Sequence, residues 1–123
     1  MTLIPMMRCR SMRISVDFYT RILDFERIDG VDDPDECSFI TLARDGGQLA
    51  LSYDDGIFGT VVVVMTSDVD TLFRTFRERG LQSPGDPDTP KQVHEGPIDQ
   101  TWGTREFYAE DPDGNTLRFT QRL

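Results

Sequence analysis

The single histidine, His94, is the side chain best suited to proton transfer near neutral pH, and it lies beside Glu95 in a proline-rich segment. The two residues together could bind a metal ion or accept a proton, but a flexible loop holds neither group in place. No serine and aspartate pattern of a hydrolase triad accompanies the histidine. We therefore expect His94 to be a solvated loop residue, with a pH-sensitive lid as the alternative.

The cysteines and the paired glycines carry no motif of their own. Cys9 and Cys37 lack the spacing of a zinc site or a redox pair, and no secretory signal precedes them. We expect reduced thiols in a cytoplasmic protein. Gly46 and Gly47 end an Arg-Asp-Gly-Gly turn, and the Asp-Gly pair in it predicts a hairpin. The glycines do not indicate a phosphate loop, because no helix follows them.

The charge balance narrows the class of partner. The 123 residues include 13 basic and 22 acidic side chains, a formal net charge of −9, and this length favours one domain. Such a balance argues against nucleic acid and anionic membranes, which both present phosphates. It suits a cationic small ligand, although solubility alone explains the charge. The valine run at 61–64 is far too short to span a membrane.

Hydrophobic spacing and turn residues predict the elements. Ser11 is a good cap for a first helix, and Ser67 or Asp68 caps a second helix that stops at Gly80. The expected strands are residues 3–9, 25–28, 38–43, 48–53, 60–66, 105–110 and 116–121. The strand at 60–66 has the composition of a buried strand, and residues 82–100 form a long polar loop of a kind that is usually functional or mobile.

The order strand, helix, short strands occurs twice, which is a fold-level repeat of about sixty residues. It predicts an α+β fold of two βαβββ modules, at approximately residues 1–55 and 59–123, within a single domain. The turn Asp111-Pro112-Asp113-Gly114 has the residues that a type I turn prefers, and we interpret it as scaffold. Arg105 and Glu106 are neighbours on a strand, so they should point to opposite faces of the sheet.

Two runs resemble a known family. VDFYTRILDFE, at 16–26, and WGTREFYAEDPDGNTLRF, at 102–119, are similar to the glyoxalase/bleomycin-resistance/dioxygenase (vicinal oxygen chelate) superfamily. The second run looks most like its bleomycin-resistance branch, and the resemblance covers nearly the whole chain. It implies paired modules whose sheets curl around a pocket, and homodimers in which the pockets lie between two chains.

The resemblance also locates a metal site. Many enzymes of this superfamily hold a divalent ion with His, Gln or Glu from four strand positions, which correspond here to Ile4, Ala50, Val61 (Thr60 in the neighbouring register) and Arg118. None of these side chains is a ligand for such an ion, and a guanidinium has no lone pair to offer. We therefore expect neither a metal nor another cofactor. This departure argues against the lyase, isomerase and dioxygenase activities of the superfamily.

Aromatic residues are the remaining candidates for a ligand site. Trp102 and Phe39 match positions at which bleomycin-resistance proteins sandwich the planar tail of their ligand, so the resemblance implies a stacking clamp. Phe39 could equally be a core strand residue. Tyr53, Phe58 and Phe107 are further wall candidates, for which we favour core packing.

Three functions stay open. The favoured one is a non-catalytic protein that sequesters a cationic or heteroaromatic compound, as in antibiotic resistance. The second is an enzyme of the same superfamily with an unusual metal site or none. The third is a regulatory module with a vestigial pocket, in which Trp102 and Phe39 would form a closed apolar core.

Overall fold

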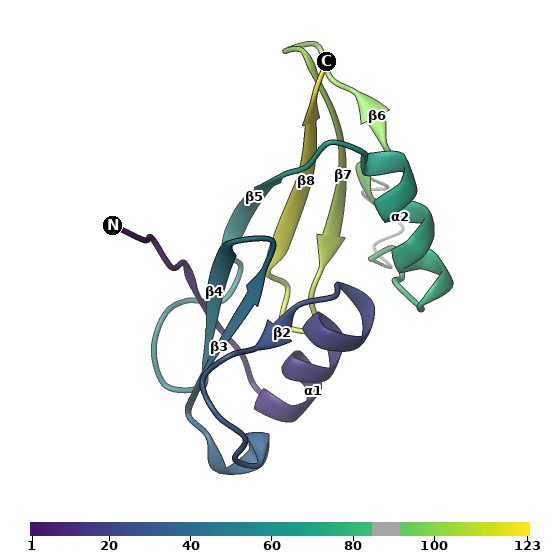
Figure 1. Ribbon diagram of the computed structural model, residues 1–123. Coiled ribbons are helices and arrows are strands. Elements are labelled where there is room, and N and C mark those ends of the chain that lie inside the picture. The colour runs from purple at the N-terminus through teal and green to yellow at the C-terminus, as the bar shows by residue number, and fades with distance from the viewer. Residues whose placement is uncertain (85–91) are drawn as a thin grey trace. The chain divides into compact units, whose positions relative to one another are not determined.

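A computed structural model describes residues 1–84 and 92–123 and shows two four-stranded sheets with few helices (Figure 1). The predicted α+β class and the repeated βαβββ order are confirmed. The chain forms two compact units: unit 1 comprises residues 1–60 and 111–115, and unit 2 comprises residues 61–110 and 116–123. Of the loop expected at 82–100, residues 85–91 lie outside the described residues.

Unit 1 contains one sheet and one short helix. Its elements are β1 (Met6–Arg8), α1 (Met12–Asp17) with a π-helical continuation at Phe18–Ile22, β2 (Glu26–Arg27), a 3-10 turn at Pro34–Glu36, β3 (Phe39–Arg44) and β4 (Gly47–Ser52). The strand order is β1-β4-β3-β2, with β1 parallel to β4 and the other neighbours antiparallel. The predicted hairpin between β3 and β4 is present, with Asp45 and Gly46 in the positive-φ conformations that a tight turn requires.

Unit 2 repeats the pattern with a longer helix. Its elements are β5 (Val61–Met65), α2 (Val69–Glu78), a 3-10 turn at Gln92–His94, β6 (Ile98–Asp99), β7 (Thr104–Glu110) and β8 (Thr116–Arg122). The strand order is β5-β8-β7-β6, with β5 parallel to β8. The two-residue strand β6 was not predicted, because its residues have no strand periodicity of their own.

The predicted helix caps are confirmed. The Ser11 hydroxyl accepts the backbone N–H of Ile14 at 3.3 Å, and a carboxylate oxygen of Asp68 accepts that of Thr71 at 3.0 Å. Each bond satisfies a backbone donor that the first turn of a helix leaves without an intrahelical partner. Helix α2 ends just before Gly80, whose φ of +106° suits glycine.

Each unit buries one face of its sheet against its helical segment. In unit 1 the fully buried Met7 packs against Tyr19, whose hydroxyl lies 3.7 Å from the methionine sulfur. In unit 2 the rings of Phe107 and Phe119 stack with centroids 4.9 Å apart, and Phe76 of α2 packs edge-on against both. Alternation along a strand places the neighbours of these residues on the opposite face.

The expected burial of strand β5 and the expected exposure of His94 were both wrong. Strand β5 is not a buried strand, because Val61, Val63 and Met65 lie on the face that α2 does not cover and are each at least half exposed. His94 is not a solvated loop residue. It is buried, and its ring meets the ring of Tyr108 edge-on with centroids 5.7 Å apart. The exposure of β5 and the burial of His94 both depend on contacts with other segments of the chain, which the polarity of the neighbouring residues in the sequence does not predict.

The turn between β7 and β8 belongs to unit 1. Asp113 accepts bonds from the backbone N–H of Arg10 and the hydroxyl of Ser15, both at 3.0 Å. Asn115 donates to the carbonyl oxygen of Arg8 at 3.1 Å and accepts the backbone N–H of Thr60 at 3.0 Å. The turn is therefore scaffold, as its sequence predicts. Long-range hydrogen bonds stabilise it in addition to the local preferences of its turn residues.

Candidate functional site

The face of the unit 2 sheet opposite α2 carries an unusual group of polar and aromatic side chains. Phe107 points toward α2, so Glu106 and Tyr108 of β7 lie on the other face. Arg118 of β8 pairs in register with Tyr108 and shares this face. As expected for strand neighbours, Arg105 lies on the other side, where it forms hydrogen-bonded ion pairs with Asp70 of α2 and with Asp99.

Glu106 is the hub of this group. It is only 1% exposed, and both of its carboxylate oxygens are bonded. One oxygen accepts the indole N–H of Trp102 at 2.9 Å and the hydroxyl of Thr104. The other accepts Nη2 of Arg118 at 2.9 Å. Burial alone would favour the neutral acid, but the bonds from Thr104, Arg118 and Trp102 outweigh it and lower the pKa of Glu106 below its usual value. The group is therefore a carboxylate at neutral pH.

Arg118 is held from two sides. Besides its bond to Glu106, its guanidinium carbon lies 4.9 Å from the ring centroid of Tyr108, which is a cation–π contact. Burial raises the pKa of Tyr108, with the positive charge of Arg118 acting in the opposite direction and the negative charge of Glu106 adding to the rise. The phenol therefore stays protonated at neutral pH. The result is a connected row, Trp102–Glu106–Arg118–Tyr108, across β7 and β8.

Trp102 is the only tryptophan of the chain and is 61% exposed. It lies in the turn before β7, where the next residue, Gly103, has a φ of +90° that favours glycine. The indole edge is anchored at Glu106 while most of the side chain stays open to solvent. A large aromatic surface that is both fixed and exposed is suited to stacking on a planar ligand.

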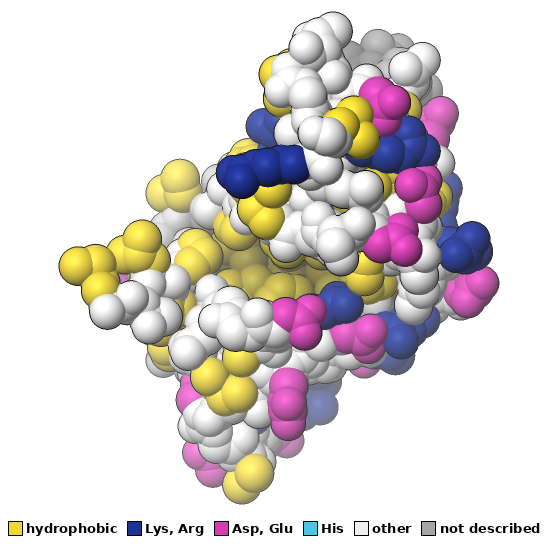
Figure 2. All heavy atoms as spheres, turned by 45° about the horizontal axis from the view of Figure 1, so that its top comes forward, with side chains coloured by type: hydrophobic (Ala, Val, Ile, Leu, Met, Phe, Trp, Pro, Cys, Tyr) yellow, Lys and Arg dark blue, Asp and Glu magenta, His cyan; other side chains and the backbone are white. Residues whose placement is uncertain are grey.

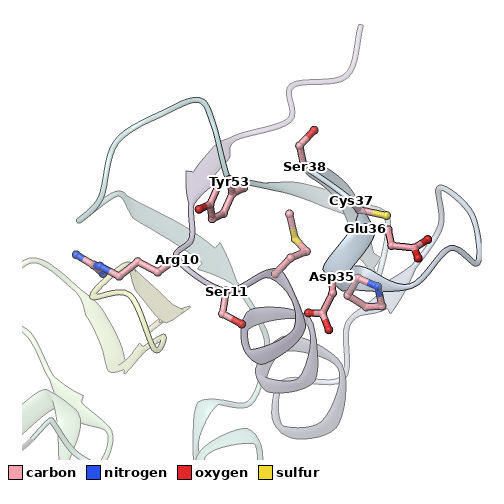
Figure 3. Close-up of a pocket in the computed structure, with 9 residues that line it drawn as sticks. Arg10, Ser11, Asp35, Glu36, Cys37, Ser38 and Tyr53 are labelled. Atoms are coloured by element: carbon pink, nitrogen blue, oxygen red, sulfur yellow. The ribbon is translucent and has the colours of Figure 1, made fainter.

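Three of the other aromatic candidates lie in unit 1. Phe39 begins β3, is 50% exposed and lies on the face opposite α1, so it is not a core residue. Tyr53 is 52% exposed and lines a pocket of about 440 Å³, with Asp35, Glu36 and Cys37 on the other side (Figure 3). Phe58 is 39% exposed, so core packing, which its sequence context favours, does not describe it.

Phe58 is already engaged within unit 1. The guanidinium carbons of Arg10 and Arg8 lie 4.0 Å and 5.2 Å from its ring centroid. Phe107 is different again. It has no exposed surface, because Phe73 and Phe76 of α2 and Phe119 of β8 surround its ring, and it is a core residue of unit 2 rather than a wall of a ligand site.

Residues 4–119 match the family model of the Glyoxalase/Bleomycin resistance protein/Dioxygenase superfamily. The chain belongs to this superfamily. Solved structures agree at the level of the fold. The chain is similar to a bleomycin-binding protein complexed with bleomycin, with 22% identity, a TM-score of 0.76, and coverage of 100% of this chain and 99% of that one.

Two further structures are similar over their whole length. A bleomycin resistance determinant encoded on the transposon Tn5 shares 21% identity, with a TM-score of 0.75 and coverage of 99% and 98%. A superfamily member from Sphaerobacter thermophilus shares 25% identity, with a TM-score of 0.68 and coverage of 99% and 98%. No curated protein matches the sequence significantly.

The four positions that the resemblance assigns to metal ligands carry side chains of other chemistry. Ile4 is exposed and Ala50 is buried in unit 1; Val61 is exposed and Arg118 is bonded to Glu106 in unit 2. Over residues 1–84 and 92–123, no group of three or more His, Cys, Asp or Glu side chains is placed to hold a metal ion. The cationic Arg118 would also repel a metal ion on the face that it shares with Val61.

The sequence indicates Trp102 but not its anchor. Arg118 and Tyr108 were not predicted as ligand-site residues, and the Arg105-Glu106 pair was interpreted as a structural or interface charge first and as a ligand contact second. The one available signal was weak: Thr104 and Glu106 alternate on the strand that directly follows the tryptophan turn. A glutamate at that position is ordinarily exposed. Its role is visible only when the pairing of β7 with β8 brings Arg118 to the same face.

Proposed function

We propose that this superfamily member binds a planar small molecule, cationic or heteroaromatic, and acts by holding the compound rather than converting it. The observation that carries the proposal is the anchored and exposed Trp102, whose indole N–H is bonded to Glu106 while 61% of the residue stays accessible. Stacking on such a ring gains affinity at a small cost in side-chain ordering. Phe39, Tyr53 and Phe58 are proposed as ligand contacts in unit 1.

The exposure of the two main candidates argues against a vestigial site. A module whose pocket had closed would bury Trp102 and Phe39 in an apolar core, yet they are 61% and 50% exposed. Aromatic residues, and tryptophan in particular, are enriched at interaction surfaces relative to the rest of a protein surface. A similar protein has been crystallised with bleomycin bound, which makes a bulky heteroaromatic compound a reasonable class of ligand for this fold.

The polar groups of the site support binding more than catalysis. Glu106 would be a poor general base, because three donors occupy its oxygens and its pKa lies below the usual value. His94 is buried against Tyr108. The side chains at the four metal-ligand positions of the superfamily's enzymes supply no donors for a divalent ion.

We further propose that the protein is a homodimer. β1 and β5 are the end strands of their sheets, and Met6, Val61, Val63 and Met65 expose apolar side chains on them. Exposed edge strands of this kind are commonly covered by a partner. Figure 2 shows hydrophobic side chains at the N-terminal segment, where Leu3 is 81% exposed, and a mixture of acidic and basic side chains elsewhere on the visible face.

We propose that the protein acts in the cytoplasm and protects against a toxic or antibiotic compound by binding it and keeping it from its target. Among the residues that the structure places, no helix is long and apolar enough to cross a bilayer. The net charge of −9 would favour a cationic compound through the summed field.

Calorimetric titration with two probes, metal-free bleomycin and the planar cation proflavine, tests the proposal. We expect saturable binding of at least one probe, and Trp102→Ala should weaken it roughly tenfold or more. Val31→Ala is the control, because Val31 is 98% exposed in a loop of unit 1. Absence of heat from both probes, or equal affinity of the Trp102→Ala and Val31→Ala variants, would contradict the proposal.

A further inference from the structure

We propose that Glu106 is a positioning residue: its carboxylate fixes the Trp102 indole in the orientation that stacks on a ligand. This inference rests on the proposed function and assigns a role to a residue that would not itself touch the ligand. Glu106 is buried, and its contacts are the tryptophan edge and the groups that hold the carboxylate in place.

Because most of Trp102 is exposed, we expect its bond to Glu106 to be the main restraint on the indole in the free protein. A tryptophan that is 61% exposed in a glycine-containing turn would otherwise sample several rotamers, and a ligand would have to select one of them. The indole N–H donates to Oε2 of Glu106 at 2.9 Å, which ties the edge of the ring and leaves its faces available. The entropy cost of fixing the Trp102 side chain in one rotamer is then part of folding and does not weaken ligand binding.

The carboxylate is itself rigid, and this makes it a good anchor. Arg118 binds the second oxygen at 2.9 Å and is in turn supported by the ring of Tyr108. The two strands that carry these residues pair directly, with Glu106 opposite Thr120 and Tyr108 opposite Arg118. The position of Trp102 therefore depends on side chains of strands β7 and β8 rather than on the loop in which Trp102 lies.

The charge state of Glu106 is essential to this arrangement. Both of its oxygens accept, one from Trp102 and Thr104 and the other from Arg118. A glutamine has a single amide oxygen and directs N–H donors from the other end. Glu106→Gln keeps the shape of the side chain, but the charged Arg118 is the stronger donor and should take the single amide oxygen, which turns the amide N–H donors toward the indole N–H of Trp102.

The single tryptophan gives the experiment a clean signal. In 15N-labelled protein there is one indole ¹H–¹⁵N resonance, which reports the Trp102 N–H directly. We expect this N–H to exchange with solvent at least roughly tenfold faster in Glu106→Gln than in the wild type, with an upfield shift of its proton resonance. The Kd for proflavine should rise about three- to tenfold in the same variant.

Glu110→Gln is the matched control. Glu110 lies further along β7 on the same face and is partly exposed, and its side chain makes no hydrogen bond or ion pair within the described part of the chain. The substitution removes the same charge from the same strand face. We expect its indole resonance and exchange rate to equal those of the wild type, and its Kd for proflavine to stay within about twofold.

Different results overturn different claims. A wild-type protein that binds neither proflavine nor metal-free bleomycin overturns the proposed function and with it the stacking role. Normal binding with an indole resonance that is the same in Glu106→Gln and the wild type overturns the positioning role alone. An altered resonance with an unchanged Kd also overturns it, because orientation would then not matter to the ligand.

The wild type alone can decide the matter if Glu106→Gln does not fold. A bonded indole N–H should exchange much more slowly than that of free tryptophan, and its resonance should shift as acid protonates Glu106. An indole N–H that exchanges at the rate of free tryptophan, with no acid-dependent shift in the folded protein, would refute the anchor.

Discussion

The hydroxyl of Tyr19 donates to Oδ2 of Asp111 at 2.8 Å, across a separation of 92 residues in the sequence. Both residues are buried, and the same carboxylate also accepts the backbone N–H groups of Asp113 and Asn115 and the side-chain amide of Asn115. Burial, then the charge of Asp111 and its bond to the phenol, raise the pKa of Tyr19 well above its usual value. The phenol is therefore always a donor in the physiological range.

Removing this hydroxyl should destabilise the protein. Tyr19→Phe leaves the ring in place but deprives a buried carboxylate of one donor, which typically costs about 1–3 kcal/mol. Urea unfolding measures the change. Tyr53→Phe, in a side chain that is half exposed, should stay within about 0.5 kcal/mol of the wild type. Equal losses in the two variants would show that the Tyr19–Asp111 bond contributes nothing specific.

Acid should selectively remove the contribution of Glu106 to stability. Its pKa is lowered in the folded protein, so the unfolded chain binds the extra proton more readily. The stabilisation is complete above the unfolded value of about 4.3 and is lost as the pH falls through the lower folded value. At pH 7, Glu106→Gln should cost about 1–3 kcal/mol of unfolding free energy.

That difference between Glu106→Gln and the wild type should shrink as the pH falls below about 4.3 and through the lower folded pKa of Glu106, because the protonated acid is neutral, as glutamine is at every pH. Urea unfolding at several pH values checks this result. A difference that stays constant from pH 7 to pH 3 would mean that the charge of Glu106 is not what stabilises the site.

The proposed dimer predicts a specific disruption. Val63 is 56% exposed on β5, so Val63→Glu should cost an isolated chain little but should place a charge in an apolar dimer contact. By light scattering at micromolar concentration, we expect a dimer for the wild type and a monomer for Val63→Glu. Val31→Glu, in an exposed loop, should remain dimeric. A monomeric wild type would refute this part of the account.

Ligand binding should not depend on a metal ion. Because Ile4, Ala50, Val61 and Arg118 stand at the positions that the resemblance assigns to metal ligands, we expect EDTA to change the Kd for proflavine by less than about twofold. Calorimetric titrations with and without chelator make the comparison. Loss of binding in EDTA, restored by Zn²⁺, Ni²⁺ or Mn²⁺, would show that other residues supply a metal site.

Local signals were enough to predict most of the fold. The caps at Ser11 and Asp68 and the Asp-Gly hairpin depend on interactions within a few residues, and the structure confirms them. The boundaries of strands β3, β4, β7 and β8 differ from the prediction by at most one residue, which is within the usual fraying of element ends.

Side-chain exposure was harder to predict, as Phe39 and Phe107 show. Both lie on strands with similar alternation, yet one is 50% exposed and the other fully buried. The difference depends on which face of each sheet its helix covers, and the strand sequence alone does not contain this information. The burial of His94 and the bond between Trp102 and Glu106 could not be predicted for the same reason. Tyr108 packs against His94, and Arg118 holds the carboxylate of Glu106, and both come from other segments of the chain.

Native mass spectrometry of freshly purified protein, before any chelator and then with added proflavine or metal-free bleomycin, shows in one spectrum whether the protein holds a ligand without a metal ion. We expect well under one metal ion per chain, and an added probe that stays bound at unchanged mass over hours. One metal ion per chain, no complex with either probe, or a bound compound whose mass changes with time would contradict a protein that works by holding its ligand.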